Sequence, residues 1–165
     1  MIDLLNLWLH LVSLAVYFGG GVVMVAVFLP AVRAVLPPSE QQRCLARGLR
    51  VYNPLSIGAL GVALMSGAFN LTSYKAALGA QFFPRIGWVL ALKLLLVFVL
   101  INLSAAATLG TGHRLVRMHQ SGETLEPERL ASMVRRMQAL TAVALILTGA
   151  TVLVALKMTY LARIP

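Results

Sequence analysis

Residues 4–36 read LLNLWLHLVSLAVYFGGGVVMVAVFLPAVRAVL, a long apolar run in which the first charged side chain is Arg33. About 20 consecutive apolar residues in a helix are enough to cross the hydrocarbon core of a bilayer. Inside that core the backbone has no water to bond to, so a spanning segment must satisfy its own amides and carbonyls as a helix. The run therefore predicts a transmembrane helix over residues 4–36.

Three further apolar runs predict helices over residues 52–74, 86–110 and 128–162. Across the chain 59% of the residues are hydrophobic and only 12% are charged, whereas about 25% are charged in an average soluble domain. We therefore expect an all-α integral membrane protein: a four-helix transmembrane bundle that forms one domain over residues 1–165.

The fourth helix is expected to begin before its apolar part. Glu126, Pro127 and Glu128 precede it. Proline fits the first helical position, and acidic side chains favour the positive end of the helix dipole. This start predicts a polar extension of the fourth helix ahead of Met137.

The basic side chains predict the orientation in the membrane. Nine arginines fall within residues 33–50 and 111–137, against three basic residues (Lys75, Arg85 and Arg163) in the opposite connection and at the C-terminal end. Loops rich in lysine and arginine stay in the cytoplasm. We therefore expect a bacterial inner-membrane protein with both termini in the periplasm. Topology and anionic lipid explain the net charge of +9, so the expected partner is the bilayer and no nucleic acid.

Several classes of chemistry are excluded by missing residues. Cys44 is the single cysteine, which rules out an intrachain disulfide and any zinc or iron–sulfur centre held by several cysteines. The sequence has no G-x-S-x-G, H-E-x-x-H, Walker or G-x-G-x-x-G motif. Hydrolytic and nucleotide-driven chemistry are therefore not expected.

A few polar side chains interrupt the apolar runs near their outer ends. At 1.5 Å per residue, His10, Lys93 and Lys157 lie about 8–10 Å inside the membrane, and Asn70 is near the outer end of its run. Ionisable groups are costly at such depths and so indicate function. They predict an outward-facing cationic pocket lined by His10, Asn70, Lys93 and Lys157. The cytoplasmic half is expected to be more uniformly apolar.

This pocket would suit a guest with acceptor groups, such as haem propionates, a quinone carbonyl or an inorganic anion. A neutral His10 could also bind copper, with Met158 as a soft partner. Each side chain has a structural interpretation as well. Both lysines could extend to the membrane surface, and His10 could bond to a neighbouring helix.

Three stretches carry a family resemblance. They are WLHLVSLAVYFGG (residues 8–20), SGAFNL (66–71) and GWVLALKLLLV (87–97). Together they resemble the copper-resistance D (CopD) family and the related HemJ-type protoporphyrinogen oxidases. The resemblance implies a haem site at His10 and Lys93, and it adds Tyr17 as the aromatic residue that follows the histidine.

Two functional hypotheses follow. The first is a CopD-like membrane protein that binds haem b or copper in the outward-facing pocket, for redox chemistry or metal handling; as an enzyme it would be a haem-dependent membrane oxidoreductase. The alternative is a non-catalytic subunit of a larger respiratory or electron-transfer complex. Small residues such as Ala59, Ala63 and Gly67 let helices approach closely, so they suit contacts within one chain, in a homodimer or in a larger complex.

Overall fold

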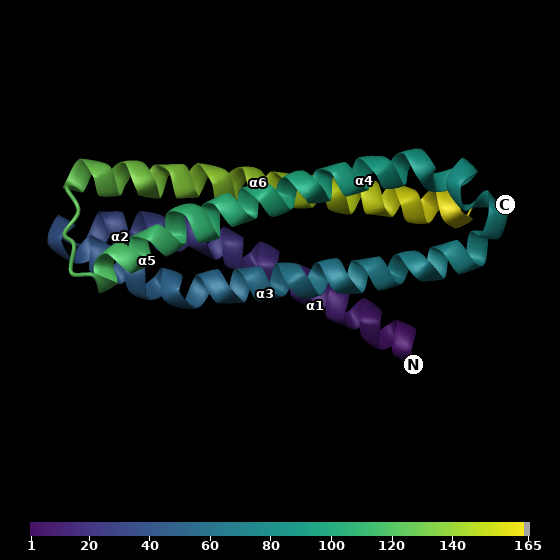
Figure 1. The fold of residues 1–165 in the computed structure, drawn as a ribbon, viewed down its shortest axis with the longest axis horizontal. Coiled ribbons are helices and arrows are strands. Elements are labelled where there is room, and N and C mark those ends of the chain that lie inside the picture. Colours follow the sequence, from purple (N-terminus) through teal and green to yellow (C-terminus); the bar gives the residue numbers. More distant parts are fainter. Residues whose placement is uncertain (164–165) are drawn as a thin grey trace.

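The computed structural model describes residues 1–163, and all regular structure in that part is helical. In chain order the elements are α1 (Ile2–Val23), η1 (Met24–Phe28), α2 (Leu29–Val35), α3 (Pro38–Leu78), η2 (Gly79–Gln81), α4 (Phe82–Ala105), η3 (Ala106–Gly112), α5 (His113–Gln120) and α6 (Pro127–Arg163). The elements η1 and η3 are π turns, and η2 is a 3-10 turn. Both π turns are continuous with their neighbours, so α1–η1–α2 and α4–η3–α5 each run on as one rod (Figure 1).

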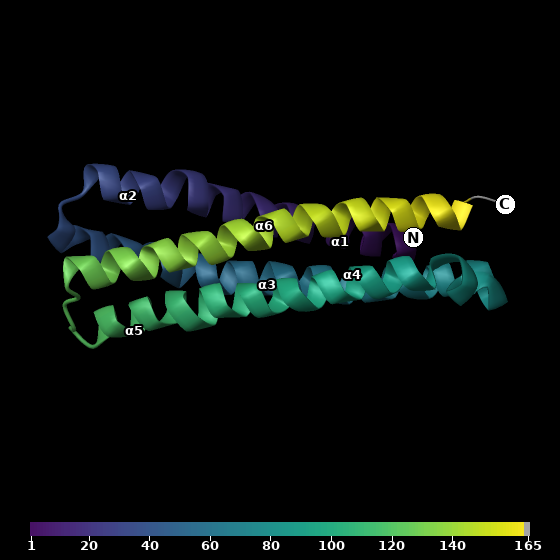
Figure 2. The same ribbon diagram turned by 90° about the horizontal axis from the view of Figure 1, so that it is seen from above.

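The long elements lie side by side as an elongated bundle (Figures 1 and 2). α1 packs mainly on α3, and α4 packs mainly on α6. The short connection at residues 36–37 and the loop at residues 121–126 lie together at one end. The η2 turn lies at the opposite end, and the N-terminus and the end of α6 also lie toward that end.

Proline and glycine set the ends of the helices. Leu36 and Pro37 have extended ψ angles of 140° and 153°, because a proline disfavours the helical conformation in the residue before it. Pro38 then begins α3. The same helix ends at Gly79, whose φ of +51° is a conformation that residues with a side chain rarely adopt. As the acidic–proline motif predicts, α6 begins at Pro127.

The second and third predicted helices are longer than the sequence pattern indicated. α3 begins at Pro38 and not near residue 52, and α5 continues the third rod to Gln120. These extensions carry arginines that the hydropathy pattern alone assigns to loops. They are helical because one face is apolar: Leu45, Leu49 and Leu115 are almost completely buried in one cluster at this end. A change from apolar to charged sequence marks the end of the apolar surface, but the helix itself continues.

Apolar surface on the outside of the bundle explains the hydropathy of the chain. The helical segments long and apolar enough to cross a membrane are Ile2–Val35, Ser39–Gln120 and Pro127–Ala162. In their most apolar windows only 22%, 22% and 17% of the residues are buried inside the bundle. Such a surface requires an apolar solvent, so the chain is an all-α membrane protein, as predicted.

Candidate functional site

His10 lies between α1 and α3. Its Nδ1 atom is 2.9 Å from the carbonyl oxygen of Ala63 and 3.1 Å from the hydroxyl of Ser66. A carbonyl can only accept a hydrogen bond, so Nδ1 carries the proton. In the neutral ring Nε2 then has a free lone pair, and among the described residues no group forms a hydrogen bond with it. A backbone carbonyl that fixes Nδ1–H in this way is the usual support for a histidine that binds a metal through Nε2.

Asn6 and Ser66 join His10 to Asn70. The Asn6 amide donates to the backbone oxygen of Ser66 at 3.0 Å and to the side-chain oxygen of Asn70 at 2.7 Å. The structure therefore brings His10 and Asn70 into one hydrogen-bonded network, the His10 network, formed by these four residues and the Ala63 carbonyl. Sequence reasoning missed Asn6 and Ser66, although each lies one helical turn before a predicted site residue.

The two lysines of the predicted pocket differ in their surroundings. Lys93 on α4 is partly buried, and its charge is close enough to His10 to act on it electrostatically. Lys157 on α6 is exposed, and no described residue forms a hydrogen bond or ion pair with it. Lys93 is thus partly buried, whereas Lys157 lies at the surface.

Tyr17 belongs to a different polar cluster. It is buried about two turns further along α1, and its hydroxyl lies 2.5 Å from the hydroxyl of Ser104 on α4. Further buried polar side chains lie around it or toward the arginine-rich end, among them Asn53, Ser56, Thr108, Thr111 and Thr141. The expectation that this half is more uniformly apolar than the other was therefore wrong. Buried serine and threonine side chains do not stand out in an apolar helix, because the helix can satisfy their hydroxyls itself. The Thr108 hydroxyl, for example, donates to the Ser104 carbonyl at 2.6 Å.

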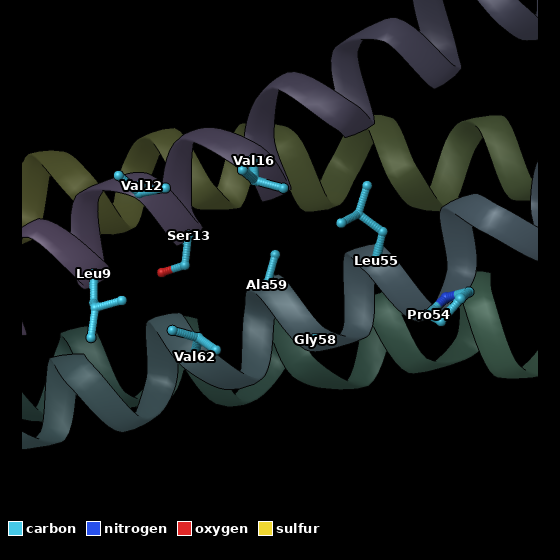
Figure 3. A pocket seen from close by; sticks show the side chains of 9 residues that line it. All are labelled: Leu9, Val12, Ser13, Val16, Pro54, Leu55, Gly58, Ala59 and Val62. Carbon is cyan, nitrogen blue, oxygen red and sulfur yellow. The ribbon is translucent and has the colours of Figure 1, made fainter.

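An apolar groove of about 300 Å³ runs between α1 and α3 beside the His10 network. Figure 3 shows Leu9, Val12, Ser13 and Val16 of α1 on one side, with residues of α3 opposite. Gly58 contributes no side chain to the floor, which keeps the groove open. The Ser13 hydroxyl donates to the His10 carbonyl at 3.0 Å, so a mostly apolar wall begins one turn from the histidine.

The donor set around His10 suits some cofactors better than others. Within residues 1–163 no three histidine, cysteine or acidic side chains come together as a metal site. Met158 is buried with Phe82 and Ile86 in an apolar cluster between α4 and α6. His10 therefore offers copper one nitrogen ligand. No cluster of histidine, cysteine or acidic side chains in residues 1–163 completes a copper site around it. Haem iron can take one axial nitrogen from a histidine; His10 offers such a nitrogen, and the groove, whose lining does not include His10, offers an apolar wall one turn away.

Comparison with protein-family models, with curated proteins and with solved structures finds no match to this chain. A functional proposal therefore depends on the fold and on the chemistry of the two polar clusters, the partly buried His10 network and the buried cluster around Tyr17. Those features define an all-α membrane protein with a histidine whose tautomer is fixed between two of its helices.

Proposed function

We propose that the chain is a CopD-like, four-helix transmembrane protein of a bacterial inner membrane that binds haem b through His10. The observation that carries this proposal is the hydrogen bond from His10 Nδ1 to the Ala63 carbonyl, which leaves Nε2 available as a ligand. Histidine is a common axial ligand of haem iron. The resemblance to the CopD and HemJ-type families supports the same residue.

In the proposed topology each rod crosses the bilayer once. The segment Ser39–Gln120 would cross twice, because it reverses direction at Gly79. Nine arginines lie in the stretches near the 36–37 and 121–126 connections, so this end would face the cytoplasm. Both termini and the His10 network would then lie toward the periplasm.

The residues around the network have separate roles in this proposal. His10 would hold the iron through Nε2, and the Lys93 ammonium would attract a propionate of the same haem. The apolar groove would cover part of the macrocycle and exclude water. When bound, a haem supplies one-electron redox chemistry, and the protein controls it through the ligand, the nearby charge and the burial of the site.

The experiment is an optical spectrum with haem and copper analysis of the detergent-purified protein. We expect a Soret band in the wild-type protein and its loss in His10→Asn. Asparagine is the informative replacement, because its amide can still donate to the Ala63 carbonyl but offers no imidazole nitrogen. The matched control is His113→Asn, since His113 is exposed at the arginine-rich end, and it should keep the band.

Other results would lead to other functions. If the wild-type protein holds stoichiometric copper that His10→Asn loses, the ligand bound at His10 is copper and not haem. A colourless, metal-free protein that assembles with other membrane chains would contradict the cofactor proposal and favour the structural subunit.

A further inference from the structure

Some hydroxyl protons in the cluster around Tyr17 are not used in hydrogen bonds between its members. Tyr17 and Ser104 share one hydrogen bond, which uses one of their two hydroxyl protons. Tyr52 and Ser56 each bring a further hydroxyl to the same cavity. The Thr141 hydroxyl has no hydrogen-bond partner among the described residues. Spare donors from α1, α3, α4 and α6 therefore meet in the bundle interior.

These hydroxyls surround a cavity of about 10 Å³. Side chains from α1, α3, α4, η3 and α6 line it, and most of the lining residues have a hydroxyl. A cavity needs roughly 10–15 Å³ of free volume, together with polar partners, to hold one water molecule. Buried donors without a partner are rare in proteins because they are costly. The size and the chemistry of the cavity thus both match one water molecule.

A second, independent observation comes from Asn53, one helical turn before the lining residue Ser56. The side-chain oxygen of Asn53 is completely buried and has no hydrogen-bond partner in the described part of the chain. A Cβ atom on Gly112 would lie 2.9 Å from the Asn53 amide nitrogen, so this side chain rests on the bare backbone of η3. A π turn departs from the regular helical hydrogen bonding and is frequent at functional sites. The irregular backbone of η3 therefore reaches the cavity, and an unpaired acceptor lies one helical turn from it.

We propose that the cavity bounded by Tyr17, Tyr52, Ser104 and Thr141 is an internal water site. The water accepts up to two hydrogen bonds from the spare hydroxyls and donates its own two protons to oxygens of the same cluster. It links the helices at a point where apolar packing is interrupted. Because each hydroxyl can give up one proton as it receives another, the site also allows protons to exchange within the membrane interior. The water site does not depend on haem binding at His10.

X-ray hydroxyl-radical footprinting of the protein in lipid nanodiscs tests the site. The radicals form from water where it lies, so a buried side chain is oxidised only when a water molecule is next to it. Tyr17 and Phe82 are 6% and 4% exposed, but Phe82 lies in an apolar cluster. After correction for intrinsic reactivity, we expect Tyr17 to be oxidised severalfold faster than Phe82.

The variant Thr141→Val removes one hydroxyl and keeps the shape of the side chain. It should lower the oxidation of Tyr17 to the level of Phe82. Thr148→Val is the matched control on α6, because the Thr148 hydroxyl already donates to the Ala144 carbonyl at 2.8 Å, and it should leave Tyr17 unchanged. If Thr141→Val does not fold, Ser104→Ala serves the same purpose. Equal oxidation of Tyr17 and Phe82 in the wild type, or no effect of the hydroxyl deletion, would overturn the proposal.

Discussion

A Cβ atom built on Gly67 would lie 3.1 Å from Cε1 of His10, so the imidazole on α1 rests against bare backbone on α3. A side chain at this position would be closer to the ring than ordinary van der Waals packing allows, so the imidazole occupies the space that the glycine leaves free. It places the ring where Nδ1 can reach the Ala63 carbonyl at 2.9 Å. The glycine thus positions the histidine, and two substitutions on α3 can separate this role from helix propensity.

Gly67→Ala should displace the His10 ring and weaken its hydrogen bond to Ala63. We expect a loss of about 1 kcal/mol in the free energy of unfolding, the net contribution of one such bond, together with a lower haem content in the purified protein. Gly61→Ala is the matched control, because nothing lies within 4 Å of its Cβ position. It should be neutral or stabilising by up to about 1 kcal/mol through helix propensity. Equal effects of the two substitutions would show that Gly67 does not position the ring.

Gln42 should be important for the stability of the arginine-rich end. Its amide donates to the Glu123 carbonyl at 2.7 Å and its side-chain oxygen accepts from the Leu125 backbone at 3.0 Å, so one side chain fixes the 121–126 loop to α3. Gln42→Ala should cost about 1–3 kcal/mol, because it leaves the backbone partners unsatisfied. Thermal unfolding in detergent measures this loss. Gln41→Ala removes only a local bond to the Leu36 carbonyl and should have a smaller effect.

A close contact between α3 and η1 predicts a coupled pair. A Cβ atom on Gly48 would meet the ring of Phe28, with Cε1 at 2.9 Å. Gly48→Ala should therefore destabilise the fold by about 1–3 kcal/mol, as overpacking does, although alanine is the better helix former. In the Phe28→Leu background the same substitution should cost less. A double-mutant cycle by denaturant unfolding measures this coupling, and additive effects would contradict the contact.

Much of the fold could be predicted from the sequence because the membrane leaves few choices for the backbone. Long apolar runs must be helices there, and the helix start predicted at Pro127 is confirmed by the structure. The helical extensions could not be read from hydropathy. Their apolar faces, which include Leu45 and Leu49, are narrow and lie among charged residues.

The π turns depend on tertiary contacts. In η1 the Val25 carbonyl accepts a hydrogen bond from the Gln138 side chain at 3.4 Å, across 113 positions of sequence. A carbonyl that loses its regular partner near Pro30 can be satisfied in this way. No local sequence signal specifies such a partner, so only the packed bundle shows where the helix departs from α geometry.

Only part of the candidate site could be predicted from the sequence. His10 and Asn70 stand out because polar side chains are rare in apolar runs. The Tyr17–Ser104 pair joins residues 87 positions apart, and its detection requires knowledge of which helices are neighbours. Serine and threonine hydroxyls are common in membrane helices, so composition alone does not show that several of them meet at one cavity.

The proposed topology predicts which single cysteines an impermeant thiol reagent can reach. In a Cys44→Ser background, Ala80→Cys lies in the η2 turn, and Ser121→Cys lies in the loop at the arginine-rich end. If the arginine-rich end is cytoplasmic, intact spheroplasts should label Ala80→Cys, whereas Ser121→Cys should react only after the membrane is permeabilised. The reverse pattern would invert the topology and place the His10 network toward the cytoplasm. Labelling of both variants in intact spheroplasts would contradict a full crossing by the rod between them, and with it the four-helix arrangement.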